Sequence, residues 1–164
     1  MPGLTIYITP KVMAAQWAGV SHKFQFNLWN FEVEAARAAV KTFQQSFDMR
    51  RFNTQGSSPW APRKRNYKHP ILEETGTLKN SIVWKRQVKG VTEHEVQIYT
   101  DPSRFGTAKR HPGFCYAAIH NSPSSLGLRT GKAANIQQRQ FMGSSTVLDQ
   151  EIKKLIPTIF KGFP

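Results

Sequence analysis

The chain is poor in acidic residues and in cysteine, and it has no long apolar run. Its 164 residues include 10 Asp and Glu against 23 Lys and Arg, which gives a formal net charge of +13. Cys115 is the single cysteine, so an internal disulfide is excluded. No run of about 18 apolar residues occurs, so we expect no membrane span. The N-terminus lacks a basic region followed by an apolar core, so we expect no secretory signal.

The excess of positive charge favours acidic partners. Nucleic acid, an anionic surface and an acidic protein face all fit it, and the charge does not choose among them. The length predicts a single domain over residues 1–164, with its core at about 31–156. Eleven Phe and four Trp supply apolar anchors, and a domain of this size can fold without a disulfide.

Residues 31–51 carry the clearest secondary-structure pattern. Apolar residues recur there at steps of three and four: Val33, Ala36, Val40, Phe43 and Phe47. This spacing places them on one face of a helix, and we favour a core helix laid on a sheet over an exposed partner-binding helix. Asn30 is predicted to be its N-cap. Glu32 and Glu34 would then lie in the first turns, near the positive end of the helix dipole.

The other elements are predicted to be short. Residues 4–9 (Leu-Thr-Ile-Tyr-Ile-Thr) alternate and indicate a strand, and residues 12–20 indicate a short helix ending near Gly19. Residues 82–88 and 91–100 predict a hairpin across Lys89-Gly90. The fold class is therefore α+β: an antiparallel sheet, from the hairpin and other short strands, packed against one long helix, with a C-terminal helix and long loops.

Three further segments have weaker patterns. Pro70 can open a helical turn that Thr75-Gly76 would end, because Gly accepts a left-handed backbone. Residues 116–120 fit either a strand or one helical turn. Residues 145–156 show helical spacing and predict a last helix ended by Pro157.

The loop from Arg50 to Lys68 is basic and contains no acidic residue. Trp60 is a large apolar residue near its middle. The loop is either a solvated connector or an arm that Trp60 docks while its basic residues meet phosphates or acidic side chains. The candidate interaction residues are Arg63, Lys64, Arg65 and Lys68.

Four groups of residues follow one another along the chain: Phe52, Gly56 and Trp60; Leu72, Thr75, Gly76, Leu78, Ser81 and Ile82; Tyr116, Ala117, Ile119 and His120; and Ile136, Arg139, Phe141 and Gly143. In this order they resemble motifs of the phage virion morphogenesis family, the tail-completion and head–tail joining proteins of tailed phages, of the Mu-like G protein type. The resemblance spans about residues 31–156. Gln137 and Gln140 stand where the family usually has proline, and the family's glycine after the histidine is missing at Asn121-Ser122.

The resemblance implies a structural protein without enzymatic activity or cofactor. It implies a place in the neck or at the tail end of a virion assembled in the bacterial host cytoplasm. There, copies would form a ring, expected to be a hexamer, beside connector and tail-tube proteins. Arms at residues 52–70 and 121–135 would then become ordered on meeting neighbouring subunits.

Catalytic and metal chemistry find little support in the sequence. His111, Cys115 and His120 do not match the usual ligand spacing of structural zinc, and Cys115 with His120 lacks an orienting third group. We expect the adjacent pair Glu73-Glu74 to be solvated instead of catalytic. Arg139, a lone Arg in an apolar segment, is expected to hold a carbonyl or carboxylate within the chain or across a subunit boundary.

Two other classes of function remain. A basic nucleic-acid-binding module, contacting DNA through the basic loop, is the alternative function, because of the net charge and because Trp60 and Tyr67 are interleaved with basic residues. A small nuclease is disfavoured, because the ten acidic residues are dispersed and predict no metal-binding cluster.

Overall fold

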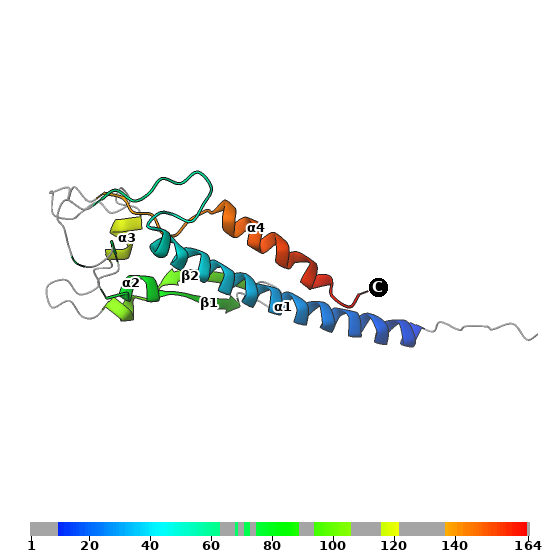
Figure 1. Cartoon of the computed structure of the whole chain (residues 1–164). Coiled ribbons are helices and arrows are strands. Elements are labelled where there is room, and N and C mark those ends of the chain that lie inside the picture. The colour runs from blue at the N-terminus through cyan, green and yellow to red at the C-terminus, as the bar shows by residue number, and fades with distance from the viewer. Residues whose placement is uncertain are drawn as a thin grey trace, which may run out of the picture.

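The computed structural model describes residues 10–62, 68, 71–72, 75–88, 94–105, 116–121 and 137–163. One helix, α1 (Pro10–Met49), is the spine of the fold. At 1.5 Å per residue its 40 residues form a rod about 60 Å long. The hairpin of β1 and β2 packs on one side of α1, and α4 packs on another (Figure 1). The predicted α+β class, with a sheet on one long helix and a C-terminal helix, is confirmed.

The predicted division of α1 into two helices is wrong. α1 is continuous from Pro10 through Gly19 and Asn30 to Met49, so Asn30 is no N-cap. Gly inside a helix costs only about 1 kcal/mol, which tertiary packing can offset. Glu32 therefore lies in the middle of the helix, where its Oε2 is 2.9 Å from Nε of Arg86 on β1. The predicted strand at residues 4–9 falls outside the described residues.

The hairpin is antiparallel. β1 (Ile82–Val88) pairs with β2 (His94–Thr100), with Trp84 opposite Ile98. Ile82 is fully buried in the core and Ile98 packs against it. Because alternate residues share a face, the exposed Lys85 and Gln97 lie on the other face. The hairpin prediction is confirmed, although the turn itself lies outside the described residues.

Short helices connect these elements. α2 (Thr77–Asn80) follows Gly76, whose φ of +67° is the left-handed conformation that glycine tolerates. Thr75-Gly76 therefore precedes a helical turn. The turn predicted to begin at Pro70 lies partly outside the described residues, so its end at Thr75-Gly76 stays a prediction. A 3-10 helix, η1 (Pro102–Phe105), follows β2, and α3 (Tyr116–Asn121) settles the ambiguity at residues 116–120 in favour of a helix.

The C-terminal helix α4 (Thr146–Leu155) is within one residue of its prediction at each end. Ser145 is its N-cap, and its Oγ accepts a hydrogen bond from the backbone N–H of Leu148. Pro157 does not stop the chain from coiling, because a 3-10 helix, η3 (Ile156–Phe160), continues directly from α4. Proline is compatible with the first positions of a helix, where its missing N–H leaves no bond unmade.

The core lies at the C-terminal half of α1. Aromatic residues from three segments meet there: Phe47 of α1, Trp60 of the following loop and Phe141 of the segment before α4. The ring centroids of Phe47 lie 5.6 Å from Trp60 and 5.2 Å from Phe141. Leu78 of α2, Ile82 of β1 and Ala117 of α3 also belong to this cluster, and Ile98 of β2 and Leu148 of α4 pack against it.

Candidate functional site

The segment Gln137–Gly143 is held against α3 by the side chain of Asn121. The Asn121 Oδ1 accepts hydrogen bonds from the backbone N–H groups of Phe141 and Met142, both at 2.9 Å. The Gln138 Nε2 donates to the Asn121 backbone carbonyl at 2.8 Å. Asn121 thereby joins α3 to the segment Gln137–Gly143, across the candidate arm at residues 121–135.

Arg139 and His120 lie at the same junction. The Arg139 backbone N–H donates to the His120 carbonyl at 2.8 Å, and the buried guanidinium donates from Nη2 to the Ala61 carbonyl at 3.3 Å. The expectation that Arg139 holds a carbonyl is confirmed. Burial lowers the pKa of the His120 imidazole below 6.5, and the positive charge of Arg139 lowers it further.

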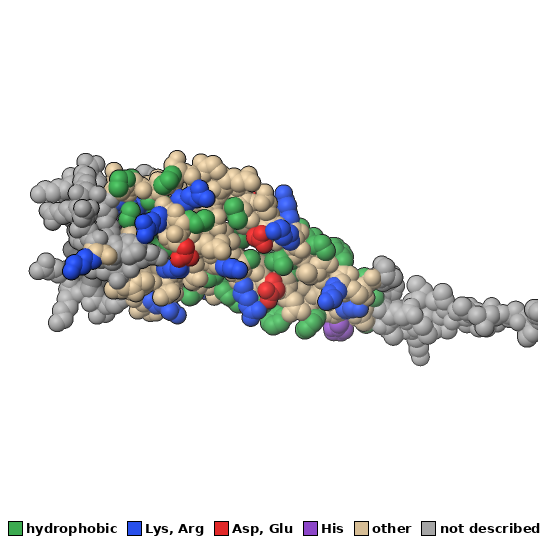
Figure 2. Space-filling view, viewed as in Figure 1, with side chains coloured by type: hydrophobic (Ala, Val, Ile, Leu, Met, Phe, Trp, Pro, Cys, Tyr) green, Lys and Arg blue, Asp and Glu red, His purple; other side chains and the backbone are tan. Residues whose placement is uncertain are grey.

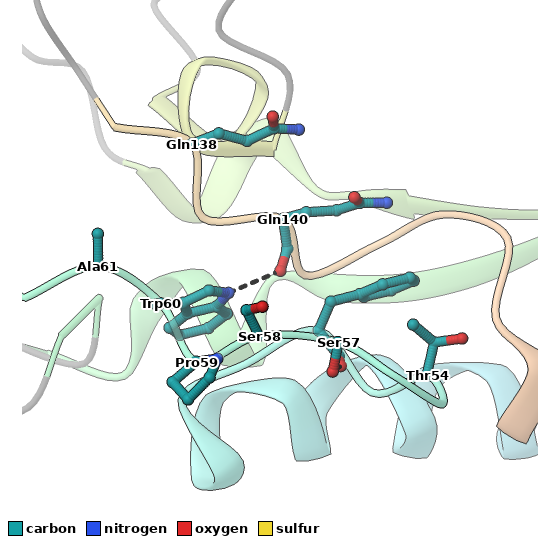
Figure 3. Close-up of a pocket in the computed structure, with 9 residues that line it drawn as sticks. Thr54, Ser57, Ser58, Pro59, Trp60, Ala61, Gln138 and Gln140 are labelled. Carbon is teal, nitrogen blue, oxygen red and sulfur yellow. Dashed lines mark hydrogen bonds between the residues drawn. The ribbon is translucent and has the colours of Figure 1, made fainter.

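Trp60 anchors the loop that follows α1. Its side chain is buried against Phe47, and its Nε1–H donates to the Gln140 carbonyl at 2.9 Å (Figure 3). Phe52 and Asn53 are buried as well, so residues 52–62 are anchored on the chain's own core at both ends of the loop. The first part of the predicted arm therefore has its contacts within a single copy. Of the basic candidates, Lys68 is exposed, whereas Arg63, Lys64 and Arg65 fall outside the described residues.

The remaining motif residues are spread along the core. Leu78 is fully buried and Leu72 packs against the core, whereas the Thr75 hydroxyl is exposed and shares a hydrogen bond with that of Thr77. Gly143 has a φ of +150°, and a Cβ there would lie 2.5 Å from the Gln140 Nε2. Tyr116 is the first residue of α3. Trp60, His120, Arg139 and Phe141 come together, and their contacts are those of a structural junction.

A groove of about 470 Å³ opens beside Trp60, between the loop and the Gln137–Gly143 segment (Figure 3). It is lined by Phe52, Thr54, Ser57, Ser58, Pro59, Trp60, Ala61, Gln138 and Gln140. These side chains offer hydroxyl and amide groups and apolar surface. None of them titrates near neutral pH, so the groove can form hydrogen bonds but holds no general acid or base.

The core-facing stripe of α1 continues beyond the core. Its apolar positions follow alternating steps of three and four: Phe26, Trp29, Val33, Ala36, Val40, Phe43 and Phe47. The C-terminal members of this α1 stripe are buried, with Ala36 at 1% and Phe47 at 0% exposure. The N-terminal members are not, since Phe26 is 62% and Trp29 44% exposed. Their rings pack on each other with centroids 6.5 Å apart.

The stripe is uncovered because α1 extends past the hairpin that covers its other half (Figure 1). Apolar side chains are visible along this projecting part of the molecule (Figure 2). The sequence pattern predicted only the stripe from Val33 to Phe47. The same spacing, followed four residues further back to Trp29 and seven to Phe26, could have revealed the rest.

A different side of the projecting part of α1 is held by the C-terminal segment, in what we call the tail clamp. The Asn27 Nδ2 donates to the carbonyls of Ile159 and Lys161 at 3.0 and 3.1 Å. The ring of Phe24 packs near those of Phe160 and Phe163, at centroid distances of 6.3 and 6.4 Å. This clamp leaves Phe160 60% exposed, so the apolar surface extends around the end of the molecule.

Within the described ranges, no three His, Cys, Asp or Glu side chains come close enough to hold a metal ion. His111, Cys115 and the pair Glu73-Glu74 fall outside those ranges. No helix in the described part of the chain is long and apolar enough to cross a membrane.

Comparison of the chain with protein-family models, with curated proteins and with solved structures finds no match in any of the three.

Proposed function

We propose that the chain is a structural assembly protein of a tailed phage or prophage, which completes the tail or joins it to the head as a ring of copies. Two observations support the proposal. The four motif groups resemble the phage virion morphogenesis family, and the α1 stripe leaves two aromatic side chains exposed where α1 projects from the body. The second observation carries the argument for self-assembly.

Exposed aromatic residues on a projecting helix are suited to subunit contacts. A continuous apolar patch on a protein surface commonly marks an interaction site, and Trp is prominent among the residues that dominate binding energy. The stripe has the same 3-4 spacing along its buried and exposed parts, so a neighbouring subunit can cover Phe26 and Trp29 as the chain's own hairpin covers Phe43. The occupant we propose is another copy of this chain.

The test is the mass of the assembly in solution. The double variant Phe26→Ser, Trp29→Ser is expected to raise the dissociation constant of the assembly at least tenfold, measured by light scattering across a concentration series. Met49→Ser is the matched control, because Met49 is an exposed apolar residue at the opposite end of the same helix. Electron microscopy of the wild-type chain should show rings. A wild-type chain that stays monomeric at high concentration, and binds neither connector nor tail-tube proteins, contradicts the proposal.

The alternative function, nucleic-acid binding, is favoured by the net charge of +13. Among the described residues on the face shown in Figure 2, however, the Lys and Arg side chains are distributed along the molecule instead of forming one basic surface. Duplex and single-strand affinities measured against salt concentration separate the two functions. Tight binding with a steep salt dependence supports the alternative, because phosphate contacts release counterions. Weak binding at physiological salt removes it.

A further inference from the structure

Among the described residues, the hairpin is a sheet of two strands with no third strand on either edge. In the described part of the chain, β1 and β2 pair only with each other. A two-stranded sheet is marginally stable unless something packs on it, and here α1 covers one face. No other described residue pairs with the outer edge of either strand, whose backbone N–H and C=O groups can bind a further strand.

The chain contains a sequence suited to be that strand. Residues 4–9, which lie outside the described residues, alternate as Leu-Thr-Ile-Tyr-Ile-Thr and carry no charge. In an extended conformation, Leu4, Ile6 and Ile8 share one face. That face matches the α1-facing side of the hairpin, where Ile82 is buried and Ile98 packs on the core.

The length of α1 separates Pro10 from the hairpin of the same copy. Glu32 marks the position of β1 along the helix, through its ion pair with Arg86. Pro10 precedes Glu32 by 22 residues, which corresponds to about 33 Å along the helix axis. Even fully extended, the six residues 4–9 reach only about 20 Å back from Pro10. Six residues are therefore shorter than the distance along α1 between Pro10 and the level of Arg86.

We propose that residues 4–9 of one copy add as a third strand to an open edge of the β1–β2 hairpin in a second copy. Main-chain hydrogen bonds supply the affinity in such strand addition, and the apolar face of the strand supplies the fit. The contact joins two different surfaces, the N-terminal segment of one copy and the sheet of the next. Head-to-tail contacts of this kind close into rings when the rotation between copies allows. The inference rests on the ring proposed above and adds a second contact between its copies, beside the one that the α1 stripe makes.

Proline substitution in the full-length chain tests the strand directly. Neighbouring N–H groups in a strand point to opposite sides, so Ile6→Pro and Tyr7→Pro together sample both sides, and at least one removes a ladder hydrogen bond. At least one of them should raise the dissociation constant of the assembly tenfold or more, whereas Ile6→Val should leave it unchanged. Circular dichroism reports whether α1 remains folded. Assembly as tight as wild type in both proline variants overturns the inference.

A cross-linking experiment identifies the edge. In a Cys115→Ser background, chains carrying Tyr7→Cys are mixed with chains carrying either Lys85→Cys or Gln97→Cys, which are exposed and opposite each other on β1 and β2. A disulfide-linked heterodimer in either mixture supports the inference and assigns the strand. A disulfide within one chain, in the matching double variants, overturns it. If the wild-type chain and both proline variants form rings, only the strand addition is contradicted. If the wild-type chain forms no oligomer, the proposed function is contradicted as well.

Discussion

A single amide side chain fixes the position of the segment before α4. The Asn121 Oδ1 accepts two backbone N–H groups, and no other side chain accepts from those two donors in the described residues. A buried N–H without an acceptor costs about 1–3 kcal/mol, so the residue matters more than its place at the end of a six-residue helix indicates.

Replacing Asn121 by alanine is expected to lower the free energy of unfolding by about 2 kcal/mol, because both N–H groups lose their acceptor. Chemical denaturation measures the change. Asn121→Asp is the matched control: it keeps the acceptor oxygen and should retain most of the stability. If Asn121→Asp destabilises as much as alanine, the hydrogen bonds to Oδ1 are not the cause.

The lowered pKa of His120 predicts a pH dependence of stability. The unfolded chain takes up a proton near the ordinary pKa of 6.5, whereas the folded chain takes it up only at lower pH. Between the two values the unfolded state binds more protons, so the free energy of unfolding falls as the pH decreases. The contribution is fully present above pH 6.5 and is lost as the pH falls through the folded pKa.

Denaturation curves at a series of pH values measure this dependence. His120→Gln should flatten the profile below pH 6.5, while His22→Gln removes an exposed imidazole and serves as the matched control. Equal profiles for wild type and His120→Gln would show that burial of His120 has no effect on stability.

At the scale of single residues, the sequence predicted part of the contact between α3 and the segment before α4. Arg139 could be assigned a carbonyl partner, because an arginine in an apolar segment has to be paired. Asn121 could not be assigned its role. The resemblance predicts a glycine at or next to this position. The two backbone N–H groups that Asn121 binds, those of Phe141 and Met142, lie about twenty residues further along the chain. Long-range side-chain contacts to the backbone leave no local pattern in the sequence.

At the scale of elements, α1 shows where local patterns are insufficient. Its end at Met49, the hairpin and α4 follow from periodicity and capping residues, and all three were predicted closely. Its beginning was predicted wrongly, because an asparagine and a glycine that often bound helices lie inside this one. Asn27 and Phe24 bind the C-terminal segment instead, and this packing supports the helix where its sequence propensity is weak.

The start of α4 depends on Ser145. Its buried Oγ accepts from the Leu148 N–H and donates to the Asn53 carbonyl, so it caps the helix and ties it to the loop after α1. Ser145→Ala is expected to lower the free energy of unfolding by about 1–2 kcal/mol, measured by thermal or chemical denaturation. The control variant is Ser144→Ala, at the exposed neighbouring position. It should change the free energy of unfolding by less than about 0.5 kcal/mol. Equal effects would mean that the hydroxyl is not a cap.

At the scale of the whole molecule, the net charge opposes self-assembly. Copies that each carry +13 repel one another, and salt screens that repulsion over about 10 Å at 0.1 M. Apolar contacts through Phe26 and Trp29 are not weakened in the same way. The proposed assembly therefore differs from nucleic-acid binding in the sign of its response to salt.

Raising the salt concentration from about 0.05 to 0.5 M should strengthen self-association, measured as a lower dissociation constant in sedimentation or light scattering. Binding of an unrelated DNA duplex to the same preparation is the comparison, and should weaken over the same range. Self-association that weakens with salt would indicate that charge pairs, and not the α1 stripe, hold the copies together.

The tail clamp also sets an order of events during synthesis. Asn27 is made early, yet the carbonyls that it binds belong to Ile159 and Lys161, more than 130 residues later. While the chain is emerging from the ribosome, the first half of α1 must wait with its aromatic side chains exposed. Several ribosomes translating one message would hold many such unfinished helices close together. Asn27 and Phe24 therefore gain their partners in the clamp only near the end of translation, whereas Phe26 and Trp29 stay exposed in the finished chain.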